Sequence, residues 1–192
     1  MRKFAAFILF FLFTYHVEAQ LYKKFRIGFG VGYASGSGYA SGGAIGTVEP
    51  AWRFTDRIIA GMRVEWAGIA RGDYKDLSAN VDVARIFSVG PNVIWYFPGE
   101  VVRTFAGAGV ASYNMLSIQY KLASGGPVQS SGDESKIGFY PRVGLELAHF
   151  VFSIDYNVIP KTRVADTEFR NSYLAIRFGF FLGGGRREPE QR

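Results

Sequence analysis

Charged residues recur inside otherwise apolar runs, at spacings that put them on one face of an extended chain. They are Arg26, Glu49, Arg53, Arg63, Glu65, Arg142, Glu146, Asp155 and Arg177. Residues two or four positions apart in a β-strand lie on the same face. Buried charges are very costly unless they are paired and hydrogen-bonded. Five arginines against four acids therefore predict an interior network of ion pairs rather than the lining of an ion-selective pore.

A second group, His149 with Ser153 and Asp155, has the residue types of a hydrolase. His149 falls at a predicted tight turn. The position two residues along, where a serine on the same strand face could pair with it, is occupied by Val151. A histidine in a turn is the better interpretation of this pattern. We therefore predict no catalytic residue and no enzymatic activity.

Three further motifs carry little specific chemistry. The repeat Gly28, Gly30 and Gly32 resembles a phosphate-binding loop, but no helix follows it, and glycine in a strand makes space for neighbouring side chains. The tripeptide 71–73 (Arg-Gly-Asp) matches a cell-adhesion string that is short enough to arise by chance. Acidic loop residues lack the spacing of a cation site; they are Asp73, Asp76, Asp133 and Glu134. We expect neither a cofactor nor a metal site.

The overall composition narrows the class of protein. The 192 residues suit one domain, and the absence of cysteine excludes disulfides and thiolate chemistry. The net charge of +6 could indicate a nucleic-acid partner, but basic residues are dispersed among acids, with no cluster beyond Arg186 and Arg187. We therefore expect no nucleic-acid partner.

The N-terminus has the pattern of a secretory signal peptide. A basic start at residues 1–3 precedes an apolar run from Phe4 to Phe13. Small or apolar residues before Gln20 suit cleavage after Ala19. The predicted organisation is a cleaved signal at 1–19, a barrel at 20–182 and a short periplasmic tail at 183–192.

Alternation of apolar and polar residues dominates the chain from Phe25 onward, and no helical period persists. No internal stretch is long and apolar enough for a spanning helix. The pattern predicts eight strands, at Lys24–Ala34, Ala44–Phe54, Arg57–Gly68, Asn80–Phe97, Val101–Leu116, Lys136–Ala148, Phe150–Pro160 and Arg170–Leu182.

The predicted connections alternate in length. Long ones fall at Ser35–Gly43, Ile69–Ala79, Ser117–Ser135 and Lys161–Phe169. Tight ones fall at Thr55–Asp56, at Pro98–Glu100 and around His149. Outer-membrane barrels have an even number of strands, short periplasmic turns and long outer loops. The pattern therefore predicts an all-β, eight-stranded, antiparallel up-and-down transmembrane β-barrel.

The two faces of each strand indicate which side meets lipid. In the last strand, Leu174, Ile176 and Phe178 alternate with Ala175 and Arg177. A membrane barrel places its apolar face outward and its polar face inward. A secreted ligand-binding barrel would do the reverse; lipocalin-like chains carry a Gly-x-Trp near the first strand, and this chain has none. The membrane orientation is favoured.

Aromatic residues near the strand ends predict two interfacial girdles. They are Tyr33, Trp52, Phe54, Trp66, Trp95 and Phe97. The fourth and fifth strands alternate less cleanly, and Arg85 falls on the apolar side, where it could snorkel. Pro50, Pro91 and Pro141 stand inside strands and are interpreted as bulge or bend positions.

The signal, the eight alternating segments and the ending from Tyr173 to Gly185 together resemble the small outer-membrane β-barrel family of Gram-negative bacteria. OmpX-type and PorT-like barrels are similar, and the resemblance covers essentially all of the mature chain. Many such barrels end on an aromatic residue that the insertion machinery reads, whereas here residues 183–192 follow the last apolar position. The resemblance implies an outer-membrane location, contact with outer-membrane lipid, lipopolysaccharide and the barrel-insertion machinery, and a monomer with no identified protein partner.

The predicted function is that of a non-enzymatic barrel with a side-chain-filled interior, acting in envelope structure or through its loops. Three alternatives remain open at this point. They are a narrow channel for small solutes, a lipid-modifying enzyme, and the accessory role in protein export that a PorT-like resemblance implies.

Overall fold

The computed structural model describes residues 22–36, 40–71, 82–99, 101–115, 119–120, 129–130, 134–164 and 167–185. Among these residues, no helix is long and apolar enough to cross a membrane. The predicted signal peptide, the tail beyond Gly185, and Gly72, Asp73, Asp76 and Asp133 lie outside the described residues. The predicted domain boundaries therefore stay predictions.

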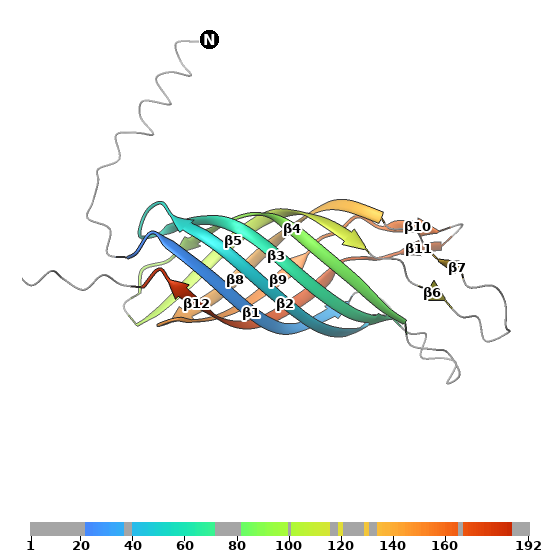
Figure 1. The fold of residues 1–192 in the computed structure, drawn as a ribbon, viewed down its shortest axis with the longest axis horizontal. Coiled ribbons are helices and arrows are strands. Elements are labelled where there is room, and N and C mark those ends of the chain that lie inside the picture. Colours follow the sequence, from blue (N-terminus) through green and yellow to red (C-terminus); the bar gives the residue numbers. More distant parts are fainter. Residues whose placement is uncertain are drawn as a thin grey trace, which may run out of the picture.

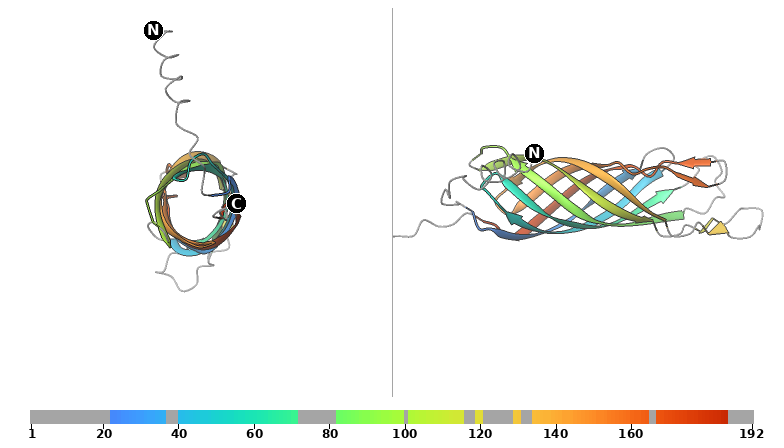
Figure 2. Two further views of the ribbon diagram at one scale, coloured as in Figure 1. Left: turned by 90° about the vertical axis from the view of Figure 1, so that its left-hand side faces the viewer. Right: turned by 90° about the horizontal axis from the view of Figure 1, so that it is seen from above.

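Eight long strands form one closed antiparallel barrel, in the order β1-β12-β9-β8-β5-β4-β3-β2 (Figure 1). Each strand pairs with its neighbours in the chain, and β1 pairs with β12 to close the ring. The view along the axis shows this ring (Figure 2). The strands are β1 (Phe25–Gly36), β2 (Ala40–Arg53), β3 (Ile58–Arg71), β4 (Asp82–Tyr96), β5 (Val102–Met115), β8 (Glu134–Leu147), β9 (Phe150–Asn157) and β12 (Tyr173–Gly183). The predicted fold class is confirmed.

The connections separate the two ends of the barrel. The short-turn end carries the connections at 54–57, 97–101 and 148–149, and there the amide of Lys23 donates to the carbonyl of Gly185 at 3.0 Å. The opposite end, here called the hairpin end, carries two small hairpins that the sequence did not predict (Figure 1). They are β6 (Gln119–Tyr120) with β7 (Gln129–Ser130), and β10 (Thr162–Val164) with β11 (Thr167–Phe169).

The first predicted long connection is wrong. Strand β1 continues to Gly36, and strand β2 already begins at Ala40. Only residues 37–39 separate the two strands. Glycine and serine led the sequence interpretation to assign a loop here. Pairing continues through this region, with an irregularity in register between Ala40 and Gly42.

The apolar face of every long strand points outward. On the outer surface, Val31, Phe178 and Ile137 are 68%, 54% and 73% exposed, whereas Arg63 and Asp155 inside are fully buried. Soluble proteins rarely expose contiguous apolar surface of this extent, but lipid requires it. The secreted-barrel alternative is therefore wrong, and the barrel has the surface of a transmembrane one.

The interior is filled because large side chains on one strand face glycine on the next. Across β5 and β8, Phe105 stands opposite Gly144, and Tyr140 stands opposite Gly109. A β-carbon added at Gly144 would lie 2.5 Å from the Phe105 ring. These reciprocal pairs let an eight-stranded barrel, whose interior is only wide enough for side chains, hold rings and guanidinium groups side by side.

The three strand prolines interrupt pairing without forming bulges. The β2–β3 register is the same on both sides of Pro50, and so are the β4–β5 register around Pro91 and the β8–β9 register around Pro141. Proline lacks the amide proton that a β-ladder needs. Each proline therefore leaves a short gap in the hydrogen bonds between its own strand and the next strand along the chain. The bulge interpretation is wrong.

We expect Gly144→Ala to lower the free energy of unfolding by about 1–3 kcal/mol, the usual cost of overpacking a filled interior. Gly46→Ala is the matched control, because a β-carbon at Gly46 meets nothing within 4 Å. Urea unfolding of the refolded barrel in detergent measures both. Equal midpoints for the two variants would contradict the interlocked packing of β5 and β8.

Candidate functional site

The barrel interior holds all nine charged residues that the sequence singled out. All are buried except Glu49, which is partly exposed. They separate into two groups at different heights along the axis. The first group, here called the central cluster, consists of Arg63, Arg142, Arg177, Glu49, Glu65 and Asp155. The second surrounds Glu146 near the short-turn end.

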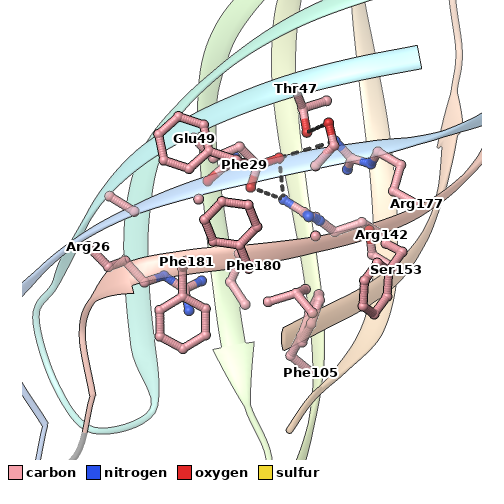
Figure 3. A pocket seen from close by; sticks show the side chains of 18 residues that line it. Arg26, Phe29, Thr47, Glu49, Phe105, Arg142, Ser153, Arg177, Phe180 and Phe181 are labelled. Carbon is pink, nitrogen blue, oxygen red and sulfur yellow. Dashed lines mark hydrogen bonds and ion pairs between the residues drawn. The ribbon is translucent and has the colours of Figure 1, made fainter. Parts of the chain in front are cut away.

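Arg142 and Arg177 connect the central cluster across the lumen. Arg142, from β8, contacts Glu49 of β2 at 2.8 Å and Asp155 of β9 at 3.1 Å. Arg177, from β12, contacts Glu49 at 3.2 Å, Glu65 at 3.5 Å and also Asp155. Figure 3 shows Glu49 between the two guanidinium groups. Strands on opposite sides of the ring are thereby joined through one set of charges.

Arg63 extends the central cluster toward the hairpin end. Its guanidinium contacts Glu65 at 3.5 Å, donates to the Asn157 side-chain oxygen at 2.8 Å and lies 3.3 Å from the centre of the Tyr140 ring. With this residue the central cluster contains three arginines and three acids. Charge is therefore balanced where burial is deepest, as the cost of burying an unpaired charge requires.

Tyrosines complete this cluster, and the sequence interpretation did not include them. The Tyr173 hydroxyl donates to Glu65, and the Tyr113 hydroxyl donates to Asn157 at 2.8 Å. Both tyrosines are fully buried. They alternate with outward apolar residues in the same way as the charges do, and this position on the polar face was the signal that could have identified them.

The second group, here called the arginine cluster, consists of Arg26, Arg53 and Arg103 around Tyr96 and Glu146. Glu146 accepts from Arg26 at 2.8 Å and from the Tyr96 hydroxyl at 2.6 Å, and Arg103 lies 4.0 Å from it. All three guanidinium groups lie within 5.6 Å of the centre of the Tyr96 ring. Cations in this geometry are attracted to the face of the ring.

At the short-turn end, Tyr22 packs on two members of the arginine cluster. Its ring centre lies 4.6 Å from the guanidinium carbon of Arg53 and 4.4 Å from that of Arg103. The same two arginines donate to the carbonyl of Asp56, at 3.1 and 2.5 Å. Rings and guanidinium groups together stack across this end of the barrel.

Arg103 is a member that the sequence analysis missed, because the fifth strand alternates less clearly than the others. In the structure it pairs in register with Glu146 on β8. The arginine cluster therefore contains three arginines around one glutamate, and the near-balance predicted for the whole interior holds within the central cluster alone.

Apolar side chains also fill part of the lumen, on the hairpin side of the central cluster. Ile45, Ile69 and Ile86 are buried there together with Tyr113 and Tyr140. Isoleucines on the inner face explain why the fourth strand alternated poorly in the sequence. The interior is thus layered: an apolar layer, the central cluster and the arginine cluster.

A cavity of about 40 Å³ lies between the two charged groups. Figure 3 shows Arg26 and Phe181 on one side of it and Arg177 on the other. A site needs roughly 10–15 Å³ to hold one water molecule. This cavity therefore has room for a few waters and no larger ligand.

The remaining predicted residues lie on the outer surface or apart from each other. The six girdle aromatics are about half exposed on the outside, at 52% for Tyr33, 48% for Trp52, 59% for Phe54, 50% for Trp66, 49% for Trp95 and 47% for Phe97. Arg85 is exposed as well. His149 lies in the β8–β9 turn and packs on the Phe181 ring, whereas Asp155 is ion-paired with Arg142 and Arg177, so these side chains do not form a catalytic relay.

Comparison with solved structures identifies similar barrels. Neisserial surface protein A is 20% identical, with a TM-score of 0.59 over 83% of this chain and 96% of that one. The attachment invasion locus protein Ail of Yersinia pestis is 15% identical, with a TM-score of 0.44 over 85% and 99% of the two chains. The N-terminal β-barrel domain of Pseudomonas aeruginosa OprF is 14% identical, with a TM-score of 0.45 over 84% and 99%.

The likeness to the neisserial protein supports the barrel fold, and at this identity it supports nothing beyond the fold. No protein-family model matches the sequence, and no curated protein matches it.

Tyr173→Phe removes the hydroxyl that donates to the buried carboxylate of Glu65. Because a buried acceptor left unsatisfied costs about 1–3 kcal/mol, we expect the free energy of unfolding to fall by that amount. Tyr156→Phe, on the neighbouring strand and 44% exposed to the outside, is the matched control. A Tyr173→Phe barrel as stable as the control would show that the tyrosine does not support the central cluster.

Proposed function

We propose that the chain is a non-enzymatic outer-membrane barrel with a sealed interior, acting in envelope structure or through interactions made at its hairpin end. The observation that carries this proposal is the central cluster. Six charged side chains from β2, β3, β8, β9 and β12 meet in the lumen and neutralise one another. An arrangement that ties five strands together supports a role in rigidity better than a role in transport.

The layers on either side of the central cluster support closure. A conducting path would have to pass buried isoleucines on the hairpin side, and apolar constrictions block conduction by excluding water. On the other side it would have to pass the Tyr22 ring stacked on Arg53 and Arg103. These two barriers disfavour the channel alternative.

The hairpin end is the part of the barrel best placed for contact with partners. Two short hairpins, β6–β7 and β10–β11, extend beyond the rim of the barrel (Figure 1). Loops carried on a rigid scaffold are common sites of recognition. A barrel stiffened from within would hold such loops in a constant relation to the membrane.

The same surface supports a proposal for location and assembly. The exposed apolar belt and its aromatic girdles fit an outer-membrane barrel that contacts lipid and lipopolysaccharide and is folded by the barrel-insertion machinery. We propose that it is a monomer. Kinship with OmpX-type or PorT-like barrels in particular stays a prediction.

Two alternatives gain no support from the interior. A lipid-modifying enzyme would need convergent catalytic groups, and the hydrolase-type residues have other partners: Asp155 is ion-paired with two arginines, and His149 packs on Phe181. An accessory role in export is favoured by no contact among the described residues.

The test of the sealed interior is conductance in planar lipid bilayers. We expect the refolded wild-type barrel to give no current above baseline. The variant that combines Glu49→Ala, Arg142→Ala and Arg177→Ala with Ile45→Ala, Ile69→Ala, Ile86→Ala and Tyr22→Ala removes side chains from the central cluster and from both flanking barriers, and we expect it to give measurable current.

Val143→Ala, an outward-facing change next to Arg142, serves as the matched control and should stay silent. Heat-modifiable mobility in detergent verifies that each variant has folded. Steady current through the wild-type barrel would contradict the proposal and support the channel alternative.

A further inference from the structure

The barrel wall is incomplete between β8 and the chain that follows β9. Hydrogen-bonded pairing of β8 with β9 spans Arg142–Leu147 and Phe150–Asp155. Toward the hairpin end only one further bridge forms, in which the Phe139 and Val158 amides each donate to the other residue's carbonyl, at 3.2 and 2.8 Å. Beyond this bridge β8 continues to Glu134, paired with β5 on its other side.

Two prolines explain why the wall opens here. The register of Arg142 with Asp155 and of Phe139 with Val158 sets Pro141 opposite Tyr156 and Pro160 opposite Ile137. Neither proline can donate to the ladder. The strand pair therefore loses a donor on each side of the single bridge.

Side chains of the two residues that precede β12 bind the chain that follows β9. The Ser172 hydroxyl accepts from the Ile159 amide at 3.1 Å and donates to the Ile159 carbonyl at 3.3 Å. The Asn171 side-chain amide donates to the Pro160 carbonyl at 2.7 Å. The backbone at 159–160 is thus bound to the segment just before β12, and a groove is left on its β8 side.

This lateral groove has a volume of about 420 Å³, within the range of small-molecule sites. Ile137, Phe139 and Tyr156 line its outward part, and all three are exposed on the apolar surface of the barrel. Gly138 and the buried Ile159 line its inner part. The groove is therefore apolar and opens sideways toward lipid.

The described charged residues that line the groove are all basic. Lys161 and Arg170 line the groove at the hairpin end, where Lys136 on β8 also donates to the Lys161 carbonyl. None of the described residues that line the groove is acidic. An apolar slot that ends in cations matches a molecule with an acyl chain and an anionic head.

We propose that the lateral groove binds one acyl chain of an anionic, phosphate-bearing membrane lipid, with its phosphate at Lys161 and Arg170. Charge-assisted hydrogen bonds from lysine and arginine are strong phosphate contacts. The chain would lie against Phe139 and Val158 and cover the stretch where the ladder lacks donors.

The test uses the full barrel refolded in detergent, titrated with phosphatidylglycerol or with phosphatidylcholine of the same chains and followed by native mass spectrometry. We expect one phosphatidylglycerol per barrel and markedly weaker retention of phosphatidylcholine. Lys161→Gln with Arg170→Gln should weaken phosphatidylglycerol binding about tenfold or more, the equivalent of one lost charge-assisted contact. Val158→Trp, which fills the groove, should abolish binding.

Matched controls separate this site from general lipid contact. Val110→Trp adds the same ring at an outward valine on β5, and Lys24→Gln with Arg57→Gln removes two exposed cations at the short-turn end. Both controls should retain the wild-type affinity. Wild-type affinity in Val158→Trp, equal binding of the two lipids, or equal losses in the controls would each overturn the proposal. The groove lies in the outer wall of the barrel. Absence of lipid binding would therefore not contradict the sealed interior, and current through the wild-type barrel would not contradict the lipid site.

Discussion

The structure depends on one constraint: in hydrocarbon, backbone amide and carbonyl groups have no water to bind and must be satisfied by one another. A chain of strands meets that demand only by closing on itself, which the pairing of β1 with β12 achieves. Closure with eight strands leaves an interior as wide as its side chains. What fills that interior, and how its charges are neutralised, follows from this narrowness.

Within so small a lumen, each large group needs an empty position opposite it. Glycine supplies that position at Gly109 and Gly144, which accommodate Tyr140 and Phe105. Because the lumen is narrow, the charged side chains also lie close together. Arg177 contacts three carboxylates on three other strands. Removing one partner from such a set leaves a buried charge uncompensated, which is more costly than the intact set is stabilising. Packing and electrostatics are therefore set by the same residue positions.

Hydrogen bonds between neighbouring strands are missing where a proline removes a backbone donor. At Pro50 and Pro91 the pairing resumes in the same register, and the adjacent strands stay together. Opposite the stretch of β8 that contains Pro141, the neighbouring chain carries a second proline, Pro160. Asn171 and Ser172, just before β12, bind that chain instead. The difference between a harmless interruption and an open groove is thus the presence of a competing partner for the backbone.

The sequence by itself determined the barrel and its orientation, because alternation with a period of two is a local property of each strand. It assigned the central charges, such as Arg63, Glu65 and Arg142, to the face that proves to be inside. Period alone could not show which charges meet, since Glu49 and Arg177 are brought together by the lateral order of strands and their register. The sequence did not reveal Arg103 or the inward isoleucines. Where the inner face carries both apolar and charged residues, it no longer differs clearly from the apolar outer face, and the alternating pattern is weak. The separation of a balanced centre from an arginine-rich end, and the opening beside β8, were decided by the tertiary structure, where contacts between residues far apart in the chain set the local charge and the local pairing.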